Sequence, residues 1–87
     1  MVEVSDKLDH ALAKKVHNIS DNIITPGLID LHTHIYWGGK SIGINQTDYA
    51  RRCGTTTMID AGTAGAGNFA GFLKYIIKPT KPRILAY

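Results

Sequence analysis

Runs of apolar residues typical of buried strands alternate along this chain with segments whose apolar residues have helical spacing. The predicted strands cover residues 23–31, 55–60 and 83–87, and the predicted helices between them cover 47–53 and 69–77. A strand, helix, strand, helix, strand order is typical of βαβ units, in which the strands are parallel. The sequence therefore predicts an α/β fold.

The last predicted strand reaches residue 87, so no helix follows it within the sequence. Both faces of a parallel sheet need cover, and three strands with two helices would leave apolar surface exposed. A chain of 87 residues suffices for one small domain at best. We expect either an incomplete copy of a larger α/β protein or a chain that assembles with others, and we favour the incomplete copy.

Two histidines stand at the carboxyl end of the first predicted strand. His32 and His34 are two residues apart, and side chains at that spacing point to the same face of an extended strand. Imidazole nitrogens are common zinc ligands, so the pair is a candidate for part of a metal site. The alternative is a pair of partly buried histidines bonded to backbone and water. On an ideal strand Asp30 would share their face, where it either orients an imidazole or bonds backbone amides near the Pro-Gly bend.

Three further features have both a functional and a structural interpretation. Asp60 stands at the end of the second strand, where catalytic groups gather in α/β barrels, but it could equally cap the next loop. Tyr36 and Trp37 either line a pocket beside a metal or pack their loop down. The loop at 62–67 orders its glycines G-x-x-G-x-G and no lysine follows. It therefore differs from the known phosphate-binding loops, and a tight turn is favoured over a phosphate site.

The composition excludes several classes of protein. A content of 44% hydrophobic and 20% charged residues argues against disorder. The net charge is +3, but the basic residues are too scattered for a nucleic-acid surface. There is neither a membrane-spanning run nor a signal pattern, so we expect a cytoplasmic protein. Cys53 is the only cysteine, which rules out a disulfide within the chain; it is predicted to be a semi-buried structural thiol.

The run Pro-Gly-Leu-Ile-Asp-Leu-His-Thr-His at 26–34 resembles the P-G-x-x-D-x-H-x-H signature of the amidohydrolase superfamily. The stretch 23–87 resembles its amidohydrolase/deacetylase subgroup, also described as dihydroorotase-like. The segments that match this subgroup are 36–39, 49–52 and 60–69. The resemblance implies a TIM-type (β/α)8 barrel with one or two zinc ions at the carboxyl ends of its strands. It also implies that His32 and His34 are metal ligands.

The resemblance divides the chain into two parts. Residues 1–22 would be the remnant of an N-terminal β-sandwich domain, and residues 23–87 the first three strands and two helices of the hydrolase barrel. It favours a short strand at 16–19 over the helix that apolar spacing predicts for 5–16. The remaining strands, a bridging carboxylated lysine or acidic residue, two more histidines and an aspartate general base would all follow Tyr87.

By this resemblance the complete protein hydrolyses a small amide, cyclic amide or acetyl ester with metal-activated water. We expect a small-molecule substrate contacted by Tyr36 and Trp37, no nucleic-acid or membrane partner, and leave a homo-oligomer open. Tyr36 stands where true dihydroorotases carry an arginine for the substrate carboxylate, which disfavours that activity. The chain alone holds no general base, so we assign it no catalytic residue and expect it to be inactive.

Two other kinds of protein remain as alternatives. One is a stand-alone metal- or phosphate-binding α/β module, which would fold cooperatively by itself. The other is a structural subunit whose sheet is completed by partner chains.

Overall fold

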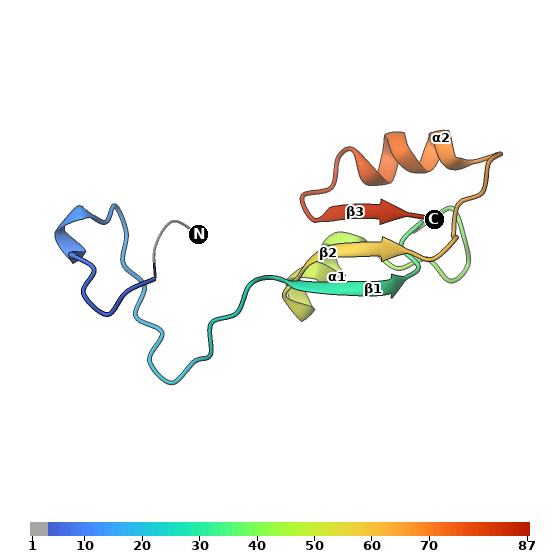
Figure 1. Cartoon of the computed structure of the whole chain (residues 1–87). Coiled ribbons are helices and arrows are strands. Elements are labelled where there is room, and N and C mark those ends of the chain that lie inside the picture. The colour runs from blue at the N-terminus through green and yellow to red at the C-terminus, as the bar shows by residue number, and fades with distance from the viewer. Residues whose placement is uncertain (1–3) are drawn as a thin grey trace.

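A three-stranded parallel sheet forms the folded part of the computed structural model, which describes residues 4–87 (Figure 1). Its strands lie in the order β1-β2-β3 and are β1 (Leu28–Thr33), β2 (Thr55–Asp60) and β3 (Arg83–Ala86). The helical connections are α1 (Gln46–Cys53) and α2 (Phe69–Phe72), which continues as the π-helical η2 (Leu73–Ile77). The predicted α/β fold of three strands with two helical connections is confirmed.

The first helix has the ends that its sequence dictates. The side chain of Asn45 accepts hydrogen bonds from the backbone N–H groups of Thr47 and Asp48, at 3.0 and 3.1 Å. Gly54 ends the helix in the left-handed conformation with φ 68°, which glycine adopts without strain. The end of the helix predicted over 47–53 is confirmed. Cys53, in contrast, is exposed, so the prediction of a semi-buried thiol is wrong.

Both helices pack on the same face of the sheet. Met58 of β2 and Ile84 of β3 are paired neighbours that point to this face and are buried. One hydrophobic cluster joins them to side chains of both helices and of the loops. Its buried members are Ile35, Met58, Ala64, Phe72, Ile76 and Ile84, with Tyr49 and Ala50 of α1 packed against them. We call this face of the sheet the covered face.

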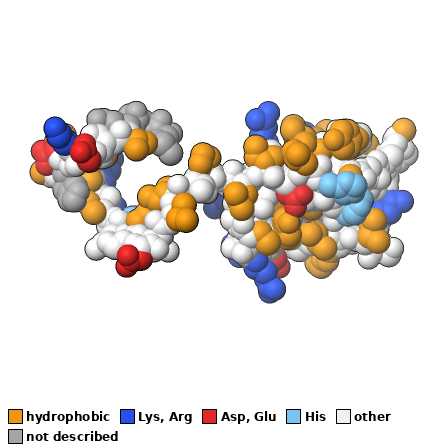
Figure 2. Space-filling model, turned by 60° about the horizontal axis from the view of Figure 1, so that its bottom comes forward, with side chains coloured by type: hydrophobic (Ala, Val, Ile, Leu, Met, Phe, Trp, Pro, Cys, Tyr) orange, Lys and Arg blue, Asp and Glu red, His pale blue; other side chains and the backbone are white. Residues whose placement is uncertain are grey.

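The opposite face of the sheet, here called the open face, has no helix on it within the described residues. Ile29 and Leu31 of β1 are 62% and 66% exposed, and Leu85 of β3 is exposed as well. Figure 2 shows apolar side chains gathered on the surface of the folded part. The expected exposure of apolar sheet surface is confirmed.

The first strand begins later than its apolar run predicts. Ile23 and Ile24 are exposed and lie outside any strand, and β1 starts at Leu28, directly after Pro26-Gly27. Proline cannot donate to a ladder, and the first ladder contact is the hydrogen bond from the Leu28 N–H to the Gly54 carbonyl. The prediction of a buried strand from residue 23 is wrong in both its start and its burial, because β1 is an edge strand with one open face.

Residues 4–27 extend away from the sheet as a separate segment (Figure 1). Their only helical element is the short 3-10 turn His10–Leu12, so the helix predicted over 5–16 and the strand predicted at 16–19 are both absent. Every side chain from 11 to 28 is exposed. A short helix needs a surface to pack on and a strand needs a partner, and this segment has neither. Its assignment to a β-sandwich domain stays a prediction.

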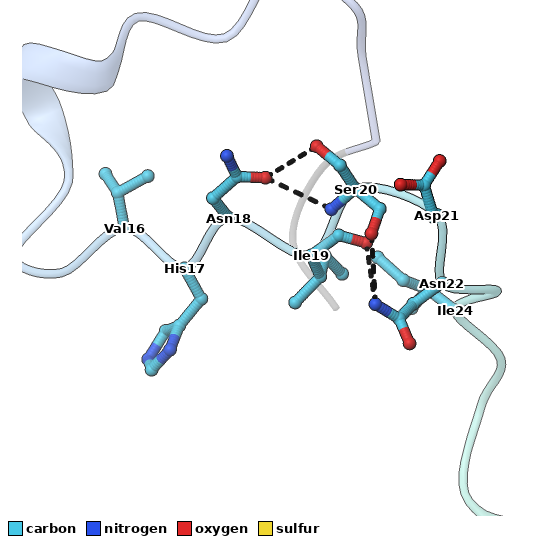
Figure 3. A pocket seen from close by; sticks show the side chains of 8 residues that line it. All are labelled: Val16, His17, Asn18, Ile19, Ser20, Asp21, Asn22 and Ile24. Atoms are coloured by element: carbon cyan, nitrogen blue, oxygen red, sulfur yellow. Dashed lines mark hydrogen bonds between the residues drawn. The ribbon is translucent and has the colours of Figure 1, made fainter.

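Residues 20 and 21 of this segment form a turn. The carboxamide oxygen of Asn18 accepts hydrogen bonds from the N–H and the hydroxyl of Ser20, and the side-chain amide of Asn22 donates to the carbonyls of Ile19 and Ser20 (Figure 3). The backbone N–H of Asn22 also donates to the Ile19 carbonyl. Asp21 has a positive φ of 69°. Side chains of this segment line an open hollow around the turn, but they all come from neighbouring positions of the chain.

Within residues 4–87, no helix combines the length and the apolar character that crossing a bilayer requires.

Candidate metal centre

The two histidines lie side by side at the carboxyl end of β1. His32 is within the strand, His34 follows its last residue, and the two ring centroids are 5.2 Å apart with the rings at 87° to each other. Their side chains therefore point to the same side of the backbone, as their spacing predicts.

A β-bulge in β1 sets which face these rings take. Asp30 lies opposite Met58 and Thr33 lies opposite Asp60, so β1 advances three residues where β2 advances two. One extra residue reverses which positions face the core. Asp30 and the buried Thr33 thus lie on the covered face, and the histidine rings lie on the open face.

The bulge overturns the expectation that Asp30 shares a face with the histidines. Its Oδ1 accepts a hydrogen bond from the backbone N–H of His32 at 3.0 Å. Its Oδ2 accepts one from the hydroxyl of Tyr49 on α1 at 2.5 Å. Asp30 thus accepts a backbone amide, but the amide of His32 and not one near the Pro-Gly bend, and it makes no hydrogen bond to an imidazole within the described residues.

The contacts of Asp30 keep it ionised. The Tyr49 hydroxyl, and after it the His32 N–H, lower the pKa of the Asp30 carboxyl. The same hydrogen bond raises the pKa of Tyr49 to about 12. Tyr49 was not among the predicted site residues. Tyr49 begins one of the segments that resemble the subgroup, but nothing in the sequence indicates its contact with Asp30, because that contact joins a helix to a strand 19 positions apart.

One polar atom of the histidine pair lacks a partner. His34 Nδ1 is buried and makes no hydrogen bond to any residue from 4 to 87. Leaving such an atom unpaired costs about 1–3 kcal/mol, so a further group beside His34 would stabilise the site. The ring separation also suits a shared ion, since two imidazoles on one tetrahedral zinc have ring centres about 5 Å apart.

These two residues are an incomplete ligand set. Zinc needs at least three protein ligands, and in the part of the chain that the structure describes no three His, Cys, Asp or Glu side chains come together. His32 and His34 therefore fit part of a metal site but do not form one alone.

Asp60 acts as a structural link. It is 1% exposed, and its oxygens accept hydrogen bonds from the N–H of Ile35 at 3.0 Å and from the N–H and hydroxyl of Thr63. Both carboxylate oxygens are occupied by these donors, which tie the loop after β1 to the loop after β2. Of the two interpretations left open for Asp60, the loop cap is the one the structure shows.

The two aromatic residues after the histidines differ in their environments. The ring of Tyr36 packs on Phe72, with centroids 4.9 Å apart, and holds its loop against the core. A side chain at Gly39 would overlap the Tyr36 ring, so glycine is required there. Trp37 is 59% exposed. A contact of either residue with substrate stays a prediction.

The glycine-rich loop is a tight turn. The N–H of Thr63 donates to Asp60 and the N–H of Gly65 donates to Asn68 Oδ1, at 2.7 and 2.8 Å. Two amides that a phosphate would use are thus already bonded within the protein. This arrangement agrees with the favoured interpretation of the loop.

Comparisons with known proteins identify relatives over most of the chain, although no family model matches it. Over 64 residues it is 50% identical to a deacetylase of Brucella anthropi and 48% identical to Deacetylase Atu3266 of Agrobacterium fabrum. A crystal structure of a dihydroorotase matches 71% of the chain with 47% identity and a TM-score of 0.64. The chain is amidohydrolase-like.

The amidohydrolase-like chain matches only part of each relative. It spans 16% of the length of the two deacetylases and 20% of the dihydroorotase chain. The α/β arrangement of three parallel strands and two helices corresponds to part of the dihydroorotase structure. The chain is thus related to deacetylase enzymes, and this agrees with the resemblance in its Pro26–His34 run.

Proposed function

We propose that His32 and His34 supply two ligands to the metal centre of a zinc-dependent hydrolase that cleaves a small amide, a cyclic amide or an acetyl ester. The observation that carries this proposal is the pair of rings 5.2 Å apart at the carboxyl end of β1, on the open face of the sheet. The names of the relatives, two deacetylases and a dihydroorotase, support this class of substrate.

We place the sheet in a (β/α)8 barrel as its first three strands. Active sites of such barrels lie at the carboxyl ends of the strands, and bulky apolar residues fill the interior. The open face fits this arrangement, since Ile29, Leu31 and Leu85 project from it beneath the histidines. The covered face would then be the outer side of the barrel, where both helices lie.

The roles of the chain's own residues follow from their contacts. His32 and His34 bind as neutral imidazoles, and Asp30 and Tyr49 fix the backbone from which His32 projects. Asp60 fixes the loop that follows His34 through the N–H of Ile35. Zinc held there would lower the pKa of a bound water molecule towards about 7 and would polarise the carbonyl to be attacked.

The remaining ligands and the general base come, in this proposal, from residues outside 4–87. A general base is needed to move a proton to the leaving group, and Asp60 cannot serve because its oxygens are occupied by Ile35 and Thr63. The 87-residue chain by itself should therefore bind metal weakly and hydrolyse nothing.

Calorimetric titration with zinc tests the ligand assignment. The chain should bind one zinc ion, and His32→Ala and His34→Ala should each weaken binding by at least about tenfold. His17→Ala is the matched control, since His17 is an exposed histidine of the extended segment, and it should bind like the unmodified chain. Equal zinc affinity in all four proteins would contradict the proposal.

A further inference from the structure

We infer that Tyr49 is a positioning residue for the histidine pair. Its hydroxyl holds Asp30, Asp30 fixes the bulge in β1, and the bulge turns both rings to the open face. This inference rests on the proposed function. It assigns a role to a helix residue that lies on the other side of the sheet from the rings and touches neither of them.

The bulge has a specific anchor. Leu31 and His32 have no partner position in β2, because the register passes from Asp30 opposite Met58 directly to Thr33 opposite Asp60. The N–H of His32 instead bonds the side chain of Asp30 at 3.0 Å. A carboxylate that accepts the N–H two residues later stabilises such a local turn. Asp30 therefore replaces the ladder contact that the bulge removes.

Tyr49 keeps that carboxylate in place. Its hydroxyl donates to Asp30 Oδ2 at 2.5 Å, while Oδ1 bonds His32. Tyr49 is half-buried in α1, whose two ends are fixed by Asn45 and Gly54, and its ring packs against the core. The Tyr49 end of this connection is thus held in place by the packing of α1. Without the hydroxyl, the Asp30 side chain would be free to turn and the His32 amide would lose its acceptor part of the time.

The consequence concerns the direction of both rings. If β1 ran without the bulge, alternation would place His32 and His34 on the same face as Asp30, beneath the helices. The hydrogen bonds of Asp30 favour the bulged form, in which the rings meet on the open face. Groups that orient metal ligands from outside the ligand set change metal affinity by about 10–100-fold when they are lost.

Amide hydrogen exchange of the full chain without metal tests the first step. In Tyr49→Phe the His32 amide should exchange about tenfold faster, because its acceptor is less well held. The amide of Ile84, on β3, should keep its rate. Tyr75→Phe is the matched control, since Tyr75 is 65% exposed on η2 and makes no hydrogen bond to Asp30. An unchanged His32 rate in Tyr49→Phe would overturn the inference, whether or not the chain binds metal.

Cobalt titration followed by visible absorption tests the second step. Tyr49→Phe should weaken cobalt binding about tenfold and alter the absorption band, and Tyr75→Phe should do neither. Asp30→Asn keeps an acceptor oxygen for the His32 N–H and should bind more tightly than Asp30→Ala. Cobalt binding by the unmodified chain with no loss in Tyr49→Phe would overturn the inference alone. Absence of binding in the unmodified chain would overturn the proposed function.

Discussion

Residues 4–27 and residues 28–87 both contain regularly spaced apolar residues, but only the second region folds into the elements that the spacing predicts. Leu8, Leu12 and Val16 have helical spacing and remain exposed outside any long helix. β1 and β2 instead bond each other through their backbones and bury Met58 beneath the helices. Periodicity therefore specifies an element only where the fold also supplies a surface for it.

The two faces of the sheet also differ in whether other elements pack against them. On the covered face α1, α2 and η2 pack against the strands. The open face carries exposed Ile29 and Leu31 together with the histidine rings. The covered face explains how the strands are held in place. The open face provides the space in which a ligand can reach both rings.

Truncation of Met58 should have the largest effect on stability. The side chain is fully buried between β2 and the helices, so Met58→Ala should lower the free energy of unfolding by about 2–5 kcal/mol. Leu31→Ala on the open face should cost less than about 1 kcal/mol. Urea unfolding followed by circular dichroism measures both variants. Similar losses for the two would show that the two faces are equally packed, which would contradict the difference between them.

Removal of the Asp60 carboxylate should have the next largest effect. Asp60→Ala leaves the N–H groups of Ile35 and Thr63 without acceptors, and each unpaired group costs about 1–3 kcal/mol. Asp60→Asn keeps one acceptor oxygen and should lose less. Urea unfolding of the two variants tests this order, and the reverse order would contradict the role of Asp60 as a link between loops.

A side chain at the junction of the two regions should be costly. A Cβ at Gly27 would overlap the side chain of Thr56 at the start of β2, so Gly27→Ala should destabilise the sheet by about 1–3 kcal/mol. Gly65→Ala is the control, because open space surrounds that position. A thermal melt of Gly27→Ala that equals that of Gly65→Ala would show that the junction is not tightly packed.

Changes within the extended segment should have the smallest effect. Leu12 is exposed and lies beyond the sheet, so Leu12→Ser should change stability by no more than about 0.5 kcal/mol. Limited proteolysis should cut residues 4–27 before the sheet. A large destabilisation by Leu12→Ser would show that this segment packs through Leu12, which would contradict its separation from the sheet.

The features predicted from the sequence are those that depend on local chemistry. Gly54 ends α1, Asp60 ends β2, and the two-residue spacing brings the histidine rings together. The start of β1 was misjudged because the apolar run passes through Pro26-Gly27, whereas the ladder begins only at Leu28. The spacing of apolar residues therefore predicts that a strand is present, but not the residue at which its pairing with β2 starts.

The bulge and its anchor could not be predicted in the same way. They depend on a hydrogen bond between Tyr49 and Asp30, which belong to different elements and leave no periodic pattern in the sequence. Ideal strand alternation put Asp30 beside the histidines, and one extra residue in the register moved it to the opposite face.

X-ray absorption at the zinc edge of the zinc-loaded chain tests the central claim, that His32 and His34 bind one ion together. The spectrum should show two imidazole nitrogens at about 2.0–2.1 Å from zinc, and one fewer in either His→Ala variant. Imidazole scattering that stays the same in His32→Ala and His34→Ala, or that is absent from the unmodified chain, would contradict it.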